Sequence, residues 1–198
     1  MSDQEVDQGK RGFLMVATGV VGGVAAAATA IPFAGSMLPS ERVKAAGAPT
    51  EVDISKLAPG EMQIVEWRGK PVWIVKRTKE MLEGIQKNDG RVSDPKSEVP
   101  LQPAYAKNEY RSIKPEIAVL EGVCSHLGCS PQFKSEEAKM DMGQDWNGGF
   151  FCPCHGSKFD FAGRVFAGSP APVNLRVPPY KFVGDAKIII IGDDGTGA

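Results

Sequence analysis

Cys-Ser-His-Leu-Gly-Cys at residues 124–129 and Cys-Pro-Cys-His-Gly-Ser at residues 152–157 are the two stretches that decide the fold. These two boxes contain all four cysteines and both histidines of the 198-residue chain. Thiolates and imidazoles are the ligands that proteins use for zinc and for iron–sulfur clusters. Any metal chemistry is therefore expected in this one part of the chain.

The two boxes together offer the ligands of a Rieske-type cluster. A [2Fe–2S] cluster needs two ligands on each iron, and in this type two histidines replace two cysteines on one iron. We predict one such cluster, with Cys124 and Cys152 on one iron and His126 and His155 on the other. Exchanging thiolate for imidazole removes negative charge, which raises the reduction potential to about −150 to +300 mV.

Cys129 and Cys154 are left over from this assignment, and we expect them at matching places in the two loops. We infer that they form a disulfide that clamps the loops over the cluster. A stable disulfide indicates an oxidising compartment such as the periplasm.

Zinc is an alternative occupant of the boxes. Four cysteines and two histidines could bind Zn²⁺ tetrahedrally, but zinc sites usually contain C-x₂₋₄-C pairs, and the first box offers a cysteine and a histidine one residue apart. A site that contains only disulfides, with free histidines, is a further alternative.

The N-terminal part of the chain predicts a membrane anchor. Residues 1–12 are a polar tail, and residues 13–35 contain no charge. About 20 apolar residues at 1.5 Å each span the hydrocarbon core of a bilayer. Pro32 is expected to kink or end this helix. Gly19 and Gly23 allow close packing of another helix, either from a partner subunit or from a second copy.

A removable export signal competes with the uncleaved anchor, since Ala46-Gly47-Ala48 resembles a cleavage site. Lys10-Arg11-Gly12-Phe13-Leu14 resembles a twin-arginine (Tat) signal with lysine in the first arginine position. That system exports folded proteins, which suits a domain with a cofactor. Basic residues before a single span also predict a cytoplasmic N-terminus and a periplasmic C-terminal domain in a bacterial inner membrane. Residues 36–50 have linker composition and are the predicted flexible neck.

The remainder, residues 51–198, is predicted to be a mainly β, antiparallel Rieske domain with a cluster-binding subdomain at about 121–172. The expected strands cover residues 62–67, 71–75, 116–120, 180–183 and 187–191. The first two are expected to form a hairpin around Arg68-Gly69-Lys70, and the last two a hairpin around Gly184-Asp185. The one expected helix covers residues 78–86, with Thr78 as its N-cap. Residues 77–115 are an insertion that serves either as a partner contact or as surface filler. Trp67 and Trp73 are expected in the core, whereas Trp146 lies either under the cluster or over the surface.

The two boxes resemble those of the Rieske iron–sulfur subunit of the cytochrome bc1 complex (ubiquinol–cytochrome c reductase). The resemblance extends from the basic tail through the anchor and neck to the β domain. It implies that Ser157 donates a hydrogen bond to a bridging sulfide, that Leu127 shields the cluster, and that His155 and His126 are exposed. The stretch 168–172 resembles the proline loop that covers the cluster from a third side.

Phe159 departs from the family pattern, which commonly has a tyrosine that donates a hydrogen bond to a cysteine sulfur. Phenylalanine cannot donate, so the resemblance implies a lower potential than in a tyrosine-bearing relative. The position still belongs to the expected cofactor-binding set.

The resemblance also implies a mechanism. Ferric iron on the imidazoles makes them readier to lose a proton, so that His155 accepts a hydrogen bond and then a proton from quinol while the cluster accepts one electron. The electron then passes to cytochrome c1 as the head domain swings about the neck, and the second electron goes to cytochrome b. The chain is thus expected to be one subunit of a dimeric, proton-translocating quinol–cytochrome c reductase (complex III), and not a complete enzyme.

Other classes are less favoured by the residues. A ring-hydroxylating oxygenase needs further histidines for its mononuclear iron, and none remain. A soluble Rieske ferredoxin generally lacks the second cysteine pair and the anchor. The small subunit of an exported oxidase, such as arsenite oxidase, differs at the position of Ser157. An inert structural module is a non-redox alternative. The net charge of −1 and the absence of a basic stripe give no indication of a nucleic-acid partner.

Overall fold

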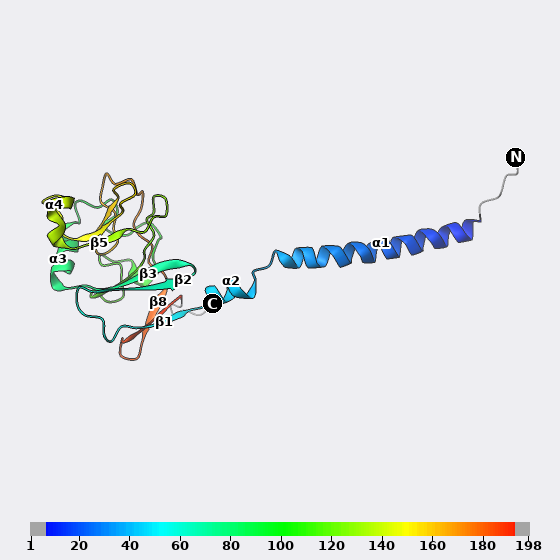
Figure 1. Ribbon diagram of the computed structural model, residues 1–198, viewed down its shortest axis with the longest axis horizontal. Coiled ribbons are helices and arrows are strands. Elements are labelled where there is room, and N and C mark those ends of the chain that lie inside the picture. The colour runs from blue at the N-terminus through cyan, green and yellow to red at the C-terminus, as the bar shows by residue number, and fades with distance from the viewer. Residues whose placement is uncertain (1–6, 193–198) are drawn as a thin grey trace. The chain divides into compact units, whose positions relative to one another are not determined.

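The computed structural model describes residues 7–192, and the chain divides between Ala45 and Ala46 into two units. Figure 1 shows the order of the elements. Besides two 3₁₀ turns (Ala104–Ala106 and Glu136–Ala138), the elements are α1 (Gln8–Ser36), α2 (Glu41–Ala46), β1 (Thr50–Asp53), β2 (Met62–Trp67), β3 (Lys70–Lys76), α3 (Lys79–Lys87), β4 (Ile117–Glu121), β5 (Gln132–Lys134), α4 (Lys139–Met142), β6 (Gly149–Phe151), β7 (Lys158–Phe159), β8 (Tyr180–Val183) and β9 (Ile188–Ile191).

The first unit is dominated by α1, a helix of 29 residues that is long and apolar enough to cross a membrane. Asp7 caps it, since its carboxylate accepts the N–H groups of Gly9 and Lys10 at 3.0 and 3.2 Å. The predicted apolar segment lies inside this helix. The alternative in which Pro32 ends the helix is wrong, because α1 continues to Ser36. A proline removes only one hydrogen bond of the ladder, and the following turn keeps its own bonds.

The predicted neck is less irregular than its linker composition indicates. Residues 41–46 form the short helix α2, and Thr50 already belongs to β1. Alanine is the best helix former, so an alanine-containing stretch can form a helical turn inside a linker. Motion of this segment stays a prediction.

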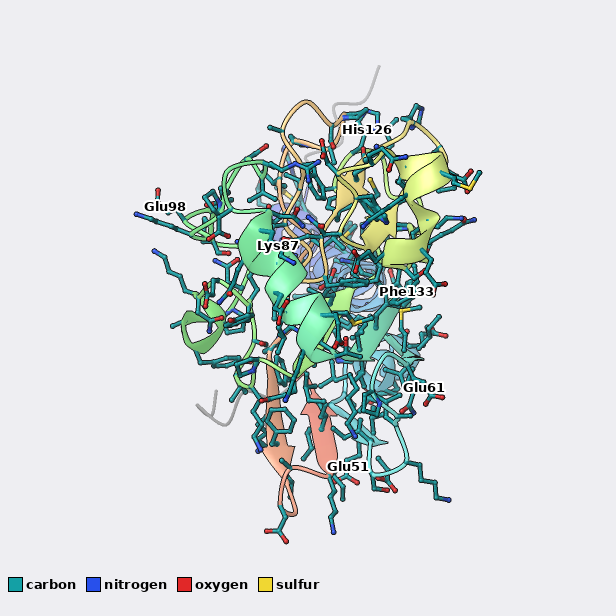
Figure 2. All side chains as sticks on the ribbon, turned by 90° about the vertical axis from the view of Figure 1, so that its left-hand side faces the viewer. Glu51, Glu61, Lys87, Glu98, His126 and Phe133 are labelled. Atoms are coloured by element: carbon teal, nitrogen blue, oxygen red, sulfur yellow. A yellow bond between two sulfur atoms is a disulfide. The ribbon has the colours of Figure 1, made fainter. Side chains whose placement is uncertain are left out.

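The second unit confirms the mainly β, antiparallel class. It contains three three-stranded sheets, with the strand orders β1-β9-β8, β2-β3-β4 and β5-β6-β7. All six strand pairs are antiparallel. In the third of these sheets, β5 and β6 lie between the two boxes, and β7 directly follows the second box. In Figure 2, His126 and Glu51 lie at opposite ends of this domain, so the cluster boxes are far from the strand by which the chain enters.

The predicted hairpin at residues 62–75 is confirmed, with Trp67 opposite Lys70 across a two-residue turn. Arg68 and Gly69 both have positive φ, at 53° and 71°, as a type I′ turn requires. The predicted helix is also confirmed as α3, and the Thr78 hydroxyl accepts the N–H of Met81 at 3.3 Å.

The core joins the sheets through aromatic contacts. Trp67 and Trp73 are buried, as predicted, with 5% and 2% exposure. The Trp73 ring stacks on Phe150 of β6 with 4.7 Å between centroids. This contact connects the β2-β3-β4 sheet to the sheet that carries the second box.

The insertion at residues 77–115 is more than surface filler, because it supplies buried arginines to the turn that follows the second box, and its role as a partner contact stays a prediction. Arg77 donates to the carbonyl of Phe161, and Arg111 donates to the carbonyl of Ala162, both at 3.2 Å. Burial lowers the pKa of Arg111 to about 10, which still leaves the guanidinium charged at neutral pH. These arginines satisfy carbonyls of the turn that follows β7.

Arg164 completes this turn as half of a fully buried ion pair. Its Nε donates to Asp160 Oδ2 at 2.7 Å, and its Nη1 donates to Asp89 Oδ1 at 2.6 Å. The other oxygen of Asp160 accepts the N–H groups of Ala162 and Arg164, each at 2.9 Å. Burial alone would lower the pKa of Arg164, but Asp160 and Asp89 outweigh it, and the pKa is raised.

Substitution of Arg164→Met should therefore leave the Asp160 carboxylate buried without its partner. We expect a loss of about 3–5 kcal/mol in the free energy of unfolding. Denaturant titration of the purified protein with its cofactor measures the loss. The exposed Arg176 is the control, since Arg176→Met is expected to cost less than about 0.5 kcal/mol. Equal losses in the two variants would contradict this role of the ion pair.

Candidate metal centre

The two boxes fold into loops with the same backbone hydrogen bonds. In the first, the carbonyl of Cys124 accepts the N–H of Gly128 at 3.0 Å, and the N–H of Cys124 donates to the carbonyl of Cys129 at 2.8 Å. In the second, Cys152 makes the equivalent bonds to Gly156 and Ser157 at 2.9 and 2.8 Å.

Glycine is required at the fourth position after the first cysteine of each loop. Gly128 and Gly156 have φ angles of 85° and 81°, in the left-handed region where a side chain is strained. Both loops therefore turn back on themselves in the same way.

This shared register corrects one expectation. Counted from the first cysteine of each loop, Cys129 matches Ser157, and Cys154 matches His126. Cys129 and Cys154 thus do not occupy matching places, as predicted from their order in the sequence. They meet because the two loops face each other, not because they are equivalent in them.

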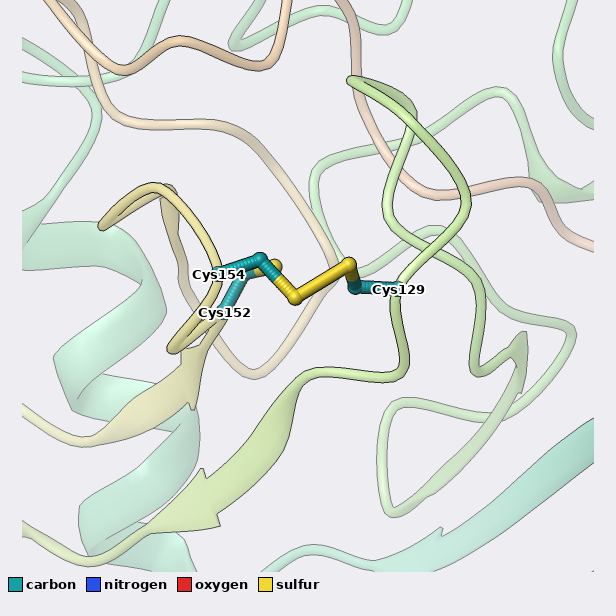
Figure 3. Close-up of side chains that lie close together, drawn as sticks. All are labelled: Cys129, Cys152 and Cys154. Carbon is teal, nitrogen blue, oxygen red and sulfur yellow. A yellow bond between two sulfur atoms is a disulfide. The ribbon is translucent and has the colours of Figure 1, made fainter.

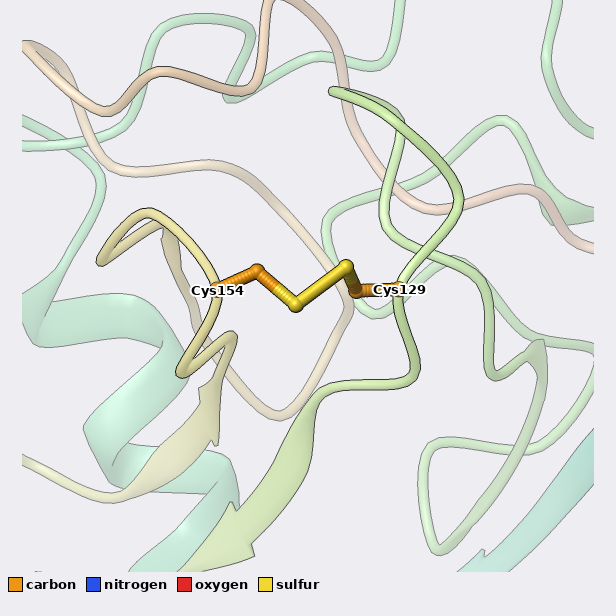
Figure 4. The surroundings of a disulfide bond; sticks show 2 residues. All are labelled: Cys129 and Cys154. Carbon is orange, nitrogen blue, oxygen red and sulfur yellow. A yellow bond between two sulfur atoms is a disulfide. The ribbon is translucent and has the colours of Figure 1, made fainter.

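The disulfide between Cys129 and Cys154 is nevertheless confirmed. Their Cα atoms are 6.7 Å apart, and the bond joins residues separated by 25 positions (Figure 4). It ties the end of the first loop to the middle of the second. The disulfide thereby reduces the conformational entropy that the chain loses on folding when the two distant loops come together.

Cys124 and Cys152 are the two free thiols, and each is buried with 2% exposure. Burial raises the pKa of the Cys124 thiol, while the N–H of His126 and the hydroxyl of Ser157 act in the opposite direction. The sulfurs of Cys129, Cys152 and Cys154 also lie within 4.8 Å of one another (Figure 3). Because two of these three are disulfide-bonded, this trio offers only one thiolate, and it is not the ligand set.

The two imidazoles lie together with their rings edge to face and 4.7 Å between centroids. Nδ1 of His126 is buried and has no hydrogen-bond partner among the described residues. A buried imidazole nitrogen without a partner, two residues from the buried Cys124 thiol, fits a metal ligand. His155 is exposed, as the resemblance implies, whereas His126 is only half-buried. The Leu127 side chain is 71% exposed.

A third segment, residues 168–173, contacts both loops. The N–H of Ala171 donates to Ser157 Oγ at 3.0 Å, and Ser125 Oγ donates to the carbonyl of Val173 at 2.6 Å. The Ser157 hydroxyl is fully buried, and its proton remains free to donate to sulfur. The position of this segment agrees with the proline loop that the resemblance implies.

Ser125 was missed by the sequence reasoning. The signal available was a hydroxyl residue between a ligand cysteine and a ligand histidine, but its partner lies 48 residues further along the chain. Trp146 is buried, so the alternative in which it covers the surface is wrong, while its place under the cluster stays a prediction. Its ring lies 5.8 Å from that of Phe166, and its indole N–H donates to the carbonyl of Ser135 at 3.0 Å.

Comparison with known proteins agrees with this geometry. Residues 49–180 match the family described as Rieske [2Fe-2S] domain. The chain is 54% identical over 196 residues to the ubiquinol-cytochrome c reductase iron-sulfur subunit of Allochromatium vinosum, covering 99% of this chain and 95% of that protein. It is 43% identical to the protein of the same name from Bradyrhizobium diazoefficiens, covering 91% and 93%.

The chain belongs to the family of ubiquinol–cytochrome c reductase iron–sulfur subunits. Its cofactor is accordingly a Rieske [2Fe–2S] cluster. Residues 1–40 match the description Ubiquitinol-cytochrome C reductase Fe-S subunit TAT signal. With the apolar helix α1, this match indicates membrane anchoring and export of the Rieske domain. A solved structure titled Hyperthermophilic respiratory Complex III is 26% identical, with a TM-score of 0.46 and coverage of 88% of this chain and 98% of that chain.

Phe159 is fully buried in β7, two residues after Ser157. Substitution of Phe159→Tyr should add a donor close to the cysteine sulfurs. A hydrogen bond stabilises the reduced, more negative cluster, and about 1–2 kcal/mol corresponds to a rise of about 40–80 mV in a one-electron potential. EPR-monitored redox titration measures it. Phe182→Tyr, in β8 of another sheet, is the control and should leave the potential unchanged. An unchanged or lower potential in Phe159→Tyr would overturn the idea.

Proposed function

We propose that Cys124, His126, Cys152 and His155 hold the single [2Fe–2S] cluster, and that the chain passes electrons from quinol to a cytochrome through it. The observation that carries the proposal is that the two free thiols are buried and interact with each other, while the two imidazole rings lie 4.7 Å apart and one of them has a buried nitrogen without a partner. Bound there, the cluster supplies a one-electron acceptor. The assignment follows because the disulfide occupies the only other two cysteines.

His155 is the residue that meets quinol in this proposal. It is the more exposed of the two histidines. One imidazole nitrogen of His155 would bind iron, which would leave the other free to accept a hydrogen bond from a quinol hydroxyl. That second nitrogen would then take the hydroxyl proton as quinol loses an electron. Leu127 forms an apolar surface beside this contact and helps to exclude water.

Ser157 and Phe159 affect the reduction potential of the site differently. The Ser157 hydroxyl donates toward sulfur and stabilises the reduced cluster, while its oxygen is held in place by the N–H of Ala171. Phe159 offers no donor. The balance between these two residues sets how strongly the centre draws an electron from quinol.

The rest of the chain supports a location of this chemistry at a membrane. The N-terminal tail at residues 1–12 lies in the cytoplasm, α1 spans a bacterial inner membrane once, and the head at residues 51–198 lies in the periplasm. Lys10 and Arg11 before the apolar run support this orientation. The Cys129–Cys154 disulfide supports an oxidising compartment for the head.

The relatives are named as subunits of ubiquinol–cytochrome c reductase, so this chain works in a complex with cytochromes. We propose cytochrome b and cytochrome c1 as the partners, in a dimeric complex that contributes to proton translocation. Quinol gives one electron to the cluster and the other to cytochrome b. The segment 36–50 then allows the head to carry its electron to cytochrome c1. Gly19 and Gly23 let α1 pack against cytochrome b.

Purification of the membrane complex through a tag on this chain tests the function. The expected result is b- and c-type haem absorbance together with the Rieske EPR signal, and quinol-dependent reduction of the c-type haem. Cys152→Ser should abolish the EPR signal and the haem reduction, because iron loses a thiolate ligand. Ser130→Ala, at an exposed position just past the first box, is the matched control and should keep both. Co-purification of a molybdenum subunit without haem would contradict the proposal.

A further inference from the structure

A recess of about 490 Å³ lies next to the second box, between three segments of the head domain. We call it the basic recess. It is lined by the insertion, the loop after α4 and the residues that flank the second box, including Arg91, Asp145, Trp146, Gly156, Lys158 and Gly168. Gly156 directly follows His155, so the wall of the basic recess includes part of the loop that carries this exposed imidazole.

Lys158 is held in the basic recess with unused donors. Its Nζ donates to the carbonyl of Met142 at 2.7 Å. An ammonium group has three N–H donors, so two remain for a further partner. The side chain is half-buried, and its backbone lies between Ser157 and Phe159 in β7.

Arg91 has unused donors as well. Its guanidinium lies over the Phe166 ring, 5.3 Å from the centroid, and Nη1 contacts Asn88 Oδ1 and the carbonyl of Asp145. Its Nε and Nη2 have no hydrogen-bond partner within residues 7–192. The aromatic face and the carbonyl therefore orient the guanidinium without neutralising it.

The charges in the basic recess do not cancel. Neither cation is in an ion pair with a carboxylate among the described residues. Asp145 is the one acidic residue of the lining, and its side chain is exposed. Two positive charges against one negative charge leave an excess of one. A single carboxylate balances that excess, whereas a phosphate dianion would exceed it.

We propose that the basic recess binds a carboxylate side chain of the c-type cytochrome when that subunit docks at the second box to receive the electron. The proposal rests on the function proposed above, since it needs a protein partner at the cluster loops. Lys158 and Arg91 donate to the incoming carboxylate, and Asp145 limits the recess to one such group. The attraction between the two cations and the incoming carboxylate favours the docked orientation and speeds docking at low ionic strength.

The test uses the purified complex and rapid mixing with quinol, and it follows electron transfer from the cluster to the c-type haem. Lys158→Gln should slow this transfer about two- to fivefold at low ionic strength, the loss expected for one exposed charge pair. High salt should remove the difference. Asp145→Asn should have the opposite effect and speed the transfer, because it removes the opposing charge. The cluster EPR signal should be unchanged in both variants.

Matched variants separate docking from folding. Lys158→Arg keeps the charge and should keep the wild-type rate. Lys139→Gln is the control outside the recess, since Lys139 pairs with Glu136 at 2.8 Å, and it should transfer normally. If the Lys158→Gln variant loses its cluster, the Arg91→Gln variant is used instead in the same assay. Wild-type rates with a wild-type salt dependence in Lys158→Gln and Arg91→Gln would overturn the proposal. Failure of the proposed function is distinguishable, because the wild-type complex itself would then not reduce haem.

Discussion

The Cys129–Cys154 disulfide is the constraint on which the site depends, because the four proposed ligands come from two separate loops. Each loop is shaped by its own backbone hydrogen bonds and by one glycine with positive φ. Those local interactions cannot bring the loops to each other. The disulfide does so, and the segment 168–173 adds hydrogen bonds to both loops. The ligands are thereby held in place by the chain as well as by iron.

Behind the second loop, a buried polar network performs the same task for the backbone. Asp160 and Arg164 close the turn after β7, and Arg77 and Arg111 satisfy carbonyls of that turn. Charged side chains are costly to bury, but each of these four makes hydrogen bonds within the network. The network connects the insertion at residues 77–115 to the strand that carries Ser157. The insertion is thus part of the support of the site.

Features that depend on local chemistry were predictable from the sequence. The Arg68-Gly69 turn, the Thr78 cap and the spacing of cysteine and histidine in each box depend on neighbouring residues, and each appears as expected in the fold. The disulfide was also predictable, because the ligand set leaves two cysteines over. The expectation that the two cysteines occupy matching places in their loops was wrong, because Cys129 has the backbone position of Ser157 and not that of Cys154. That register is visible only once the loops are folded.

Features that depend on distant partners were not predictable. Asp160 and Arg164 are close in sequence, but Asp89, which completes the pair, is contributed by the insertion. The bond from Ser125 to Val173 and the convergence of Arg91 with Lys158 likewise need the tertiary structure. The continuation of α1 through Pro32 and the helix α2 inside the predicted neck show the limits of composition. A linker-like or proline-containing stretch can still be helical when its hydrogen bonds are mostly kept.

The most direct test of the account is pulsed EPR of the reduced protein after labelling its histidines with ¹⁵N. One cluster held by Cys124, His126, Cys152 and His155 predicts hyperfine couplings from two histidine nitrogens. Because His155 is exposed and His126 is half-buried, the two couplings should be inequivalent. Coupling to no histidine nitrogen, or to a single one, would contradict the ligand set and with it the proposed contact of His155 with quinol.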